Sequence, residues 1–358
     1  MNLISSFILL VSFTLLGVHA ELLAVIQEGK RQHFKLGQYT RSRYSTFIPK
    51  KYDPSFLYAQ TTDVDRTHMS AQSNLYGLFP VSTNDQQWQN NINWQPIPVH
   101  PANKVILSSL LYPKNCPAFT KELLAVLSSE EFTTYDSENS GLYAYLTANS
   151  GINVTDIITA NDIWDAVKIE DSVGYSLPAW VKSIYPEPIR TMTGKYFEVF
   201  THTTAMKRLT IGPFLNEVVE HLESMAANPT SSYKYKMYSA HDTNIAAILN
   251  AFDAFSPSFP PAFASTIYIE LHKENWKNVV KVFNKELDTV RQVSINGCEL
   301  SCPLASVRKY LSNIIIDADT RDAECNSSGG DKVLLGSAAT TSKYSAEELE
   351  QKFAGVST

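Results

Sequence analysis

Long hydrophobic runs are nearly absent from this sequence of 358 residues. One apolar run, residues 7–18, lies close to the N-terminus and is shorter than the roughly 20 apolar residues of a transmembrane helix. The residues that follow it, Val18-His19-Ala20, are typical of a signal peptidase site. We therefore predict a cleaved signal peptide over residues 1–20 and no membrane span after cleavage. An uncleaved signal anchor is the alternative.

The sequence also lacks an excess of basic residues. It contains 30 Lys and Arg against 36 Asp and Glu, which gives a formal net charge of −6. A nucleic-acid-binding domain needs a positively charged face, so we expect no nucleic acid among its partners. A small anionic ligand remains compatible with this composition, because a local group of arginines can bind phosphate on an acidic protein.

Cysteine is scarce, with four residues, all after the predicted signal peptide: Cys116, Cys298, Cys302 and Cys325. An even number in a secreted chain indicates two disulfides, for which three pairings exist. A local loop can join Cys298 to Cys302, which would leave Cys116 with Cys325. The sequence has no second cluster of Cys or His at metal-binding spacing, so we expect no metal site.

Hydrophobic patterns divide the mature sequence into parts. Strand-like and helix-like segments alternate over residues 21–105 and 229–325, whereas residues 106–228 are helical in pattern. We therefore predict an α/β fold with a central, mostly parallel sheet flanked by helices in three layers. Residues 106–228 would form a smaller helical cap inserted into it. The Gly-, Ser- and Thr-rich residues 326–358 are expected to form a mobile tail.

Several elements can be placed more closely. The pattern predicts strands at residues 22–26, 57–59, 233–238, 264–272 and 278–283, and helices at 27–47, 70–79, 212–227, 243–252 and 303–314. Ligands of open parallel sheets bind at the carboxyl ends of the strands. Polar residues that follow these strands are therefore candidates for a functional site.

His241 and Asp242 are adjacent between the strand that ends at Tyr238 and the next helix. A helix N-terminus offers free N–H groups and the positive end of a dipole, which favour an anion. A protonated His241 can hold a phosphate oxygen, and a protonated Asp242 can pass its proton to a leaving alkoxide. In the alternative interpretation, Asp242 only caps the helix and His241 is a satisfied core residue.

Arg66 lies in the polar segment 61–67, close after Asp63 and Asp65, and is expected in a loop. A guanidinium suits phosphate because it donates two parallel hydrogen bonds. The alternative is a structural ion pair between Arg66 and one of these carboxylates. The other histidines of the mature sequence are expected to be structural or exposed: His33, His68, His100, His202, His221 and His272.

Together these segments resemble the histidine acid phosphatase family, in its prostatic and lysosomal branch. The stretches Gly29–Tyr39, Thr62–Ala71, Ser239–Thr243 and Gly297–Leu304 look like the family's first long helix, arginine loop, His-Asp motif and C-terminal disulfide turn. The resemblance implies hydrolysis of small phosphomonoesters through a phosphohistidine, without a cofactor, in a secreted or lysosomal protein.

The resemblance also implies roles for three residues. Arg66 and His241 would bind the substrate phosphate, and Asp242 would be the catalytic proton donor. Two sequons of the same chain, at Asn153 and Asn326, predict N-glycosylation.

The sequence departs from the family at the nucleophile. The family has an Arg-His-Gly-x-Arg-x-Pro motif after its first strand, and its His attacks phosphorus while its arginines hold the phosphate. Here Ile26 is followed directly by Gln27-Glu-Gly29, and no Arg-His-Gly triplet occurs anywhere. Gln60 also stands where the family usually has Arg. Loss of a nucleophile costs several orders of magnitude in rate, so we expect this exact chain to be inactive and less stable than a full-length relative.

Three hypotheses account for the departure. The first is an acid phosphatase whose sequence lacks an exon through splicing or gene prediction. The second is a non-catalytic secreted relative that binds phosphate or another ligand. The third is a phytase-like hydrolase, which His241-Asp242-Thr-Asn fits less well. The sequence is also compatible with a homodimer.

Overall fold

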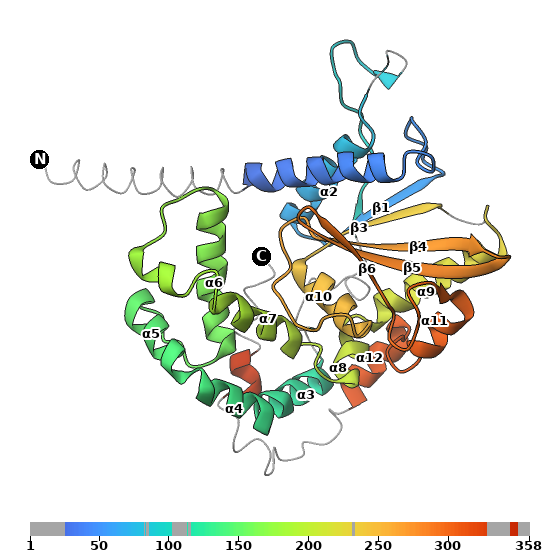
Figure 1. Cartoon of the computed structure of the whole chain (residues 1–358). Coiled ribbons are helices and arrows are strands. Elements are labelled where there is room, and N and C mark those ends of the chain that lie inside the picture. The colour runs from blue at the N-terminus through green and yellow to red at the C-terminus, as the bar shows by residue number, and fades with distance from the viewer. Residues whose placement is uncertain are drawn as a thin grey trace, which may run out of the picture.

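The computed structural model describes residues 26–81, 83, 86–101, 113, 116–230, 233–327 and 344–349. The predicted signal peptide, most of the strand predicted at residues 22–26 and most of the predicted tail lie outside these ranges. Figure 1 shows two neighbouring sheets with helices on both faces and a block of helices to one side. The α/β class predicted from the sequence is confirmed.

A parallel sheet of three strands carries the candidate site. Its order is β2 (His100–Pro101), β1 (Leu57–Thr61) and β3 (Tyr235–Ser239). Leu57 pairs with Tyr235 at one end and Thr61 with Ser239 at the other. The carboxyl ends of β1 and β3 therefore lie side by side at one edge of the sheet.

The second sheet is antiparallel. It contains β4 (Thr266–Glu274), β5 (Lys277–Glu286), β6 (Thr289–Val293) and β7 (Cys302–Pro303). Asn275 and Trp276, the two residues between β4 and β5, both have positive φ angles, 47° and 65°. Two such residues form the tight turn that matches the twist of a hairpin. The parallel strands of the fold are thus β1, β2 and β3, and β6 of the antiparallel sheet was not predicted from the sequence.

Two helices cross closely over the parallel sheet. Residues 26–43 form the first, and α2 (Asp65–Leu78) is the second. A Cβ atom on Gly37 would lie 2.0 Å from the Asn74 carbonyl oxygen, and one on Gly77 would lie 2.2 Å from that of Phe34. The two backbones approach so closely that only glycine fits at both positions. This contact anchors α2, whose first turn faces the site.

The remaining helices form a block and a C-terminal pair. They are α3 (Pro117–Leu127), α4 (Glu130–Glu138), α5 (Ser140–Ser150), α6 (Ile157–Ser172), η2 (Ala179–Ser183), α7 (Ile189–Val199), α8 (Thr204–Thr210), α9 (Gly212–Ala227), α10 (Asp242–Ala251), α11 (Leu304–Tyr310) and α12 (Ala318–Ser327). One continuous core joins the block to α10 and the antiparallel sheet, through residues such as Leu146, Phe200, Leu249 and Val280. The helical block is thus packed directly on the part of the chain that carries His241.

Two disulfides join distant and local parts of the fold. Cys116 pairs with Cys325, which ties the start of α3 to α12, and Cys298 pairs with Cys302. In the predicted tail, Leu349 is buried in the core and the Tyr344 hydroxyl donates to Asp156 of the block. Both sequon asparagines are exposed. None of the helices in the described ranges is both long enough and apolar enough to cross a bilayer.

Candidate functional site

The site lies where α2 and α10 begin next to each other. β1 leads into α2 through residues 62–64, and β3 leads into α10 through Ala240 and His241. The Thr62 amide donates to the Ser239 carbonyl oxygen over 3.1 Å, which extends the parallel pairing by one residue. Two helix N-termini therefore point to one edge of the sheet, and each contributes free N–H groups. Figure 1 shows α2 and α10 on opposite faces of β1 and β3.

Arg66 lies in the first turn of α2, not in a loop as the sequence suggested, because α2 begins at Asp65. It forms no ion pair with Asp63 or Asp65, all three being in the described part of the chain, so the structural ion pair is absent. Its Nη2 instead lies 3.4 Å from Nδ1 of His241. The structure thus brings together the two residues predicted to bind substrate, which are 175 positions apart in the sequence.

A chain of hydrogen bonds determines the tautomer of His241. A guanidinium can only donate, so Nδ1 of His241 accepts from Arg66 and the ring proton is on Nε2. Nε2 then donates to the Thr62 hydroxyl over 3.0 Å. Thr62 in turn donates to the Thr67 hydroxyl over 2.8 Å, and Thr67 donates to the Val64 carbonyl oxygen over 2.7 Å. The Thr67 hydroxyl also lies 3.0 Å from the Thr62 carbonyl oxygen, and the chain as a whole orients the imidazole.

His241 is neutral in the free site. Burial, and next the positive charge of Arg66, lower the pKa of its imidazole to about 4. The protonated form predicted from the sequence would therefore need an added negative charge beside the ring. A phosphate placed between Arg66 and His241 would supply that charge, because an anion near a titrating base raises its pKa.

Asp242 is the first residue of α10 and its side chain is exposed. Its Oδ1 accepts from the Thr243 amide over 2.7 Å, and the residue does not act as the helix cap. The capping contact comes from Asn244, whose Oδ1 accepts from the His241 amide over 3.2 Å. Although Asp242 borders solvent, the surrounding protein desolvates its carboxyl and raises its pKa, against the lowering effects of the Thr243 amide and Arg66. A carboxyl that keeps its proton in mild acid can act as a general acid.

Two acidic residues of α6, Asp162 and Asp165, were missed by sequence reasoning, and Asp165 interacts electrostatically with Asp242. Burial, then repulsion from Asp242 and from Asp162, raise the pKa of Asp165 to about 7. The Asp165 carboxylate accepts from the Asn161 side-chain amide over 3.3 Å. These residues belong to the helical block, far from the His-Asp pair in sequence, so no local pattern could connect them to it.

Gln60 occupies the position where the family resemblance leads one to expect a guanidinium. It lies in β1, paired with Tyr238 and His100. Its side-chain oxygen is buried and has no hydrogen-bond partner in the structure. An amide here brings no charge to the site, so Arg66 supplies the positive charge that the described residues bring close to His241.

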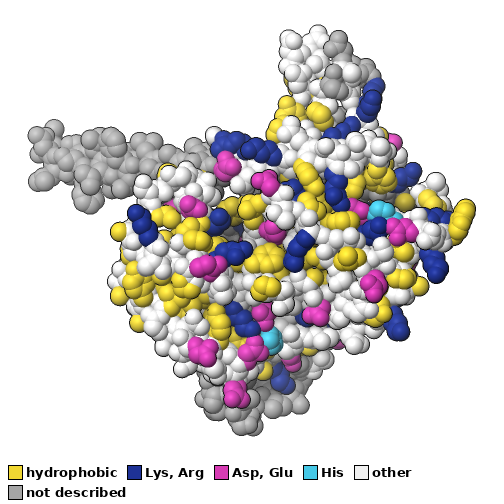
Figure 2. Space-filling view, viewed as in Figure 1, with side chains coloured by type: hydrophobic (Ala, Val, Ile, Leu, Met, Phe, Trp, Pro, Cys, Tyr) yellow, Lys and Arg dark blue, Asp and Glu magenta, His cyan; other side chains and the backbone are white. Residues whose placement is uncertain are grey.

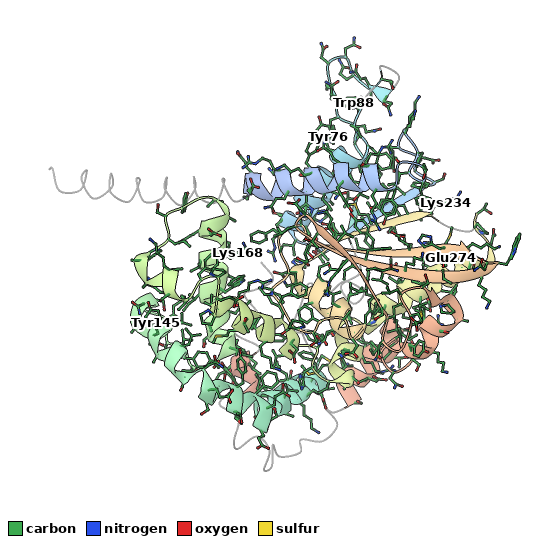
Figure 3. All side chains as sticks on the ribbon, viewed as in Figure 1. Tyr76, Trp88, Tyr145, Lys168, Lys234 and Glu274 are labelled. Atoms are coloured by element: carbon green, nitrogen blue, oxygen red, sulfur yellow. A yellow bond between two sulfur atoms is a disulfide. The ribbon has the colours of Figure 1, made fainter. Side chains whose placement is uncertain are left out.

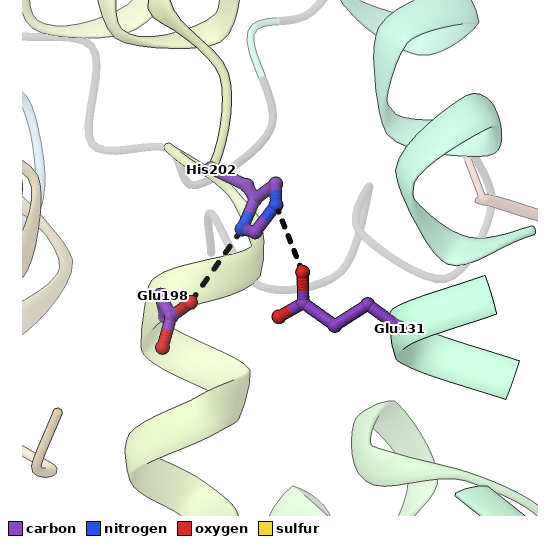
Figure 4. Close-up of side chains that lie close together, drawn as sticks. All are labelled: Glu131, Glu198 and His202. Atoms are coloured by element: carbon purple, nitrogen blue, oxygen red, sulfur yellow. Dashed lines mark ion pairs between the residues drawn. The ribbon is translucent and has the colours of Figure 1, made fainter. Parts of the chain in front are cut away.

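One group outside this site has metal-binding residue types. The ligand atoms of Glu131, Glu198 and His202 lie within 4.8 Å of one another (Figure 4). The Lys195 ammonium lies 2.5 Å from Glu131 and 2.9 Å from Glu198, beside a hollow of 480 Å³ lined partly by α4. Lys195 pairs with both carboxylates and His202 lies 3.5 Å from each, so these residues already form an ion-pair network among themselves.

Three of the other histidines have different surroundings. His33 lies within the helix of residues 26–43, and burial lowers the pKa of its imidazole to about 4. His100 stacks on Tyr58 with ring centroids 4.8 Å apart, and His272 pairs with Glu270 over 2.6 Å. Acidic and basic side chains are interspersed over the face in Figure 2.

Comparison with known proteins gives one consistent family. Residues 16–285 match the histidine phosphatase superfamily (branch 2). Human prostatic acid phosphatase is 32% identical over 297 residues, covering 81% of this chain and 76% of the relative. Lysosomal acid phosphatase of Xenopus laevis is 30% identical over 306 residues, covering 84% of this chain and 70% of the relative.

Solved structures agree on the fold. The apo form of Hafnia alvei phytase superposes with a TM-score of 0.61 at 16% identity, covering 81% of this chain and 87% of the phytase. The complex of the same phytase with tartrate gives a TM-score of 0.62 at 16% identity, with the same two coverages, 81% and 87%.

Proposed function

Because this chain belongs to branch 2 of the histidine phosphatase superfamily, we propose that it is an acid-phosphatase-type protein whose site binds the phosphate group of a small phosphomonoester. The observation that supports the proposal best is the meeting of Arg66, His241 and Asp242 at the N-termini of α2 and α10. Backbone N–H groups, a guanidinium and an imidazole are the usual partners of a phosphate, and a protonated carboxyl completes them.

Each residue has a distinct role in the proposal. Arg66 turns its Nη2 from His241 towards two phosphate oxygens. His241, released from Arg66 at Nδ1 and facing the anion, gains a proton there and donates it as a hydrogen bond. In a form of the site that has a nucleophile, Asp242 would give its proton to the ester oxygen of the departing alcohol, which its raised pKa favours.

Turnover needs a nucleophile in addition. The sequence contains no Arg-His-Gly triplet, and His241 is engaged at both ring nitrogens, with Arg66 and Thr62. We propose that this exact chain binds phosphate but does not hydrolyse monoesters above background. The experiment is to assay p-nitrophenyl phosphate and phytate at acid pH. Turnover of the aryl phosphate would refute the proposal that this chain is inactive. Preferential turnover of phytate would favour the phytase-like alternative.

The origin of the missing motif is a separate question. An acid phosphatase with a lost exon would have extra codons between Ala24 and His33 in its transcript. Amplification of the transcript across these positions tests this version. A message without extra codons there leaves the non-catalytic relative as the account of this protein.

Phosphate binding is tested by calorimetry on the full chain in mild acid. Titration with inorganic phosphate should give a measurable affinity that Arg66→Met lowers by tenfold or more, as expected for loss of a charged hydrogen-bonding group worth roughly 1.5–3 kcal/mol. Arg190→Met is the matched control, because Arg190 pairs with Glu187 at 3.6 Å on the exposed surface of the block. Equal affinities for the wild type and Arg66→Met would overturn the proposed site.

We also propose a cellular location for the protein from its relatives. The compared relatives include a lysosomal and a prostatic acid phosphatase. We place this chain in the secretory pathway as a secreted or lysosomal glycoprotein, modified at Asn153 and Asn326. Mobility on a gel before and after glycosidase treatment checks the modification, and light scattering checks whether a homodimer forms.

A further inference from the structure

Strand β3 has one paired edge and one open edge. The Tyr235 amide donates to the Phe56 carbonyl oxygen over 3.0 Å, at the start of the pairing with β1. In a parallel pair, alternate residues bond to the same neighbour, so Lys236 and Tyr238 direct their N–H and C=O groups away from β1. Within the described ranges, no strand pairs with this side of β3. The backbone groups of both residues are therefore open to a further strand.

The side chains beside this open edge are apolar but only partly buried. Tyr235 and Met237 pack on the core that β1 shares with α2, whereas Tyr238 packs on the core of the opposite face. On β4 of the second sheet, Ile267 and Ile269 are partly buried as well. A strand in the middle of a sheet is normally covered on both faces. An apolar strand next to β3 would therefore complete the burial on both faces.

The order of the elements places a preceding strand on this side. Helix α2 connects β1 to β2, and the helix of residues 26–43 leads into β1, both over the same face of the sheet (Figure 1). Crossovers between parallel strands are right-handed, so two of them over one face step across the sheet in the same direction. Since β2 lies on one side of β1, a strand before the first helix belongs on the other side. There β3 already adjoins β1, so the open edge of β3 is the position that remains.

The helix of residues 26–43 covers the region where such a strand would lie. Its glycine contact joins it to α2, and the Thr40 hydroxyl lies 2.8 Å from the Tyr268 hydroxyl of β4. Figure 3 labels Lys234, just before β3, and Glu274, the last residue of β4, at the same end of the molecule. β3 and β4 therefore run in opposite directions under a helix that contacts both sides.

We propose that residues 22–26 of this chain form a further strand, parallel to β3 and bound to its open edge beneath the helix of residues 26–43. Their sequence, Leu-Leu-Ala-Val-Ile, is apolar at every position, as in strands that are buried on both faces. Five residues also match the length of β3. The sheet order becomes β2, β1, β3 and the new strand. This inference does not depend on the proposed phosphate site.

The connection requires a change only in the first turn of the helix, which begins at Ile26 in the structure. The Glu28 carboxylate pairs with Arg31 over 2.8 Å on the surface, and exposed ion pairs of this kind contribute little to stability. A Cβ on Gly29 would meet nothing within 4 Å, so the turn is not held by packing there. Residues 27–29 then form the turn between strand and helix, and a glycine is common in turns.

Other strands compete for an open edge in principle, because unpaired N–H and C=O groups also pair with a second copy of a chain or with a peptide. Residues 22–26 have the advantage of direct attachment to the helix that covers the edge. A short tether raises the effective concentration of a segment far above that of a separate molecule. The segment of the same chain is therefore the occupant that the structure favours.

Hydrogen exchange of single amides, followed by NMR on the full chain, tests the proposal. The amides of Lys236 and Tyr238 should exchange as slowly as that of Met237, which is directed to β1. Val25→Pro removes a donor from the new strand and should accelerate exchange at Lys236 and Tyr238 by at least about tenfold, with Met237 unchanged. Gln27→Pro is the matched control, because a turn tolerates proline, and it should keep both amides slow.

A milder variant covers the case in which Val25→Pro does not fold. Val25→Gly keeps the amide but weakens a strand, and it should accelerate exchange at Lys236 and Tyr238 by about threefold. Fast exchange of both amides in the wild type, or slow exchange that neither substitution changes, would overturn the proposal. Protection that increases with protein concentration and survives Val25→Pro would identify a second copy as the occupant and would overturn it equally.

Discussion

Arg66 and His241 lie 3.4 Å apart between Nη2 and Nδ1, and this contact makes the imidazole an acceptor on that side. Two groups that would both bind phosphate thus bind each other in the free protein. Burial and then the charge of Arg66 keep His241 neutral, and the contact places its proton on Nε2, towards Thr62. Ligand binding must therefore exchange one donor–acceptor pair for two contacts with the anion.

The protonation of His241 can be measured directly. Nitrogen-detected NMR of the imidazole should show the Nε2–H tautomer and a pKa near 4, because burial and Arg66 disfavour the charged ring. Added phosphate should raise this pKa, since the anion stabilises the charged ring. A free-state pKa close to the ordinary histidine value, unchanged by phosphate, would contradict the proposed exchange of partners.

Anion affinity should increase in acid because of Asp165. Its pKa of about 7 means that it loses its negative charge as the pH falls through neutrality. Sulfate keeps both charges over this range, so a stronger sulfate affinity at about pH 6 than at about pH 8 reports the protein alone. Asp165→Asn should flatten the profile and Glu170→Gln should preserve it. A wild-type profile that is already flat would show that Asp165 does not act on the anion.

The hydroxyl of Thr67 should contribute to stability, because Thr67 is 3% exposed and its hydroxyl joins Thr62 to the Val64 carbonyl oxygen. Thr67→Val leaves the buried Thr62 hydroxyl without an acceptor for its proton, and the free energy of unfolding should fall by roughly 1–3 kcal/mol in urea denaturation. Thr133→Val is the control, since the exposed hydroxyl of Thr133 donates only to carbonyl oxygens of its own helix. Equal stability of the two variants would mean that the hydrogen-bond chain is dispensable.

The close helix crossing gives a second stability test. A Cβ on Gly77 would lie 2.2 Å from the Phe34 carbonyl oxygen, so Gly77→Ala must push the helix of residues 26–43 away from α2. We expect a loss of roughly 1–3 kcal/mol in the free energy of unfolding. Gly29→Ala in the same helix meets nothing within 4 Å and should raise stability by up to about 1 kcal/mol. Identical thermal melts for both variants would be inconsistent with the crossing.

Local sequence patterns predicted the parts of the site that lie next to regular elements. The strand before Ser239 and the helix after His241 follow from alternation and helical spacing, so the His-Asp pair was placed correctly between them. The start of α2 was missed because Asp63, Asp65 and Thr67 are as common in loops as in the first turn of a helix. Arg66 consequently lies on a helix rather than in a loop.

Contacts between residues far apart in the sequence could not be predicted from it, for a physical reason. The tautomer of His241 depends on Thr62, which is 179 positions away, and the charge state of Asp165 depends on Asp242 of another element. Such pairs have no periodicity that links them. Strand β6 was missed because Thr289–Val293 is short and half polar, and it is recruited by pairing with β5.

The most direct test of the phosphate site is a crystal structure grown with phosphate in mild acid. The account predicts one phosphate between the Arg66 guanidinium and the His241 ring, at the N-terminus of α10, with the contact between those two side chains broken and Asp242 within hydrogen-bond distance of an oxygen. A site without phosphate, in which Arg66 still donates to Nδ1 of His241, would contradict it.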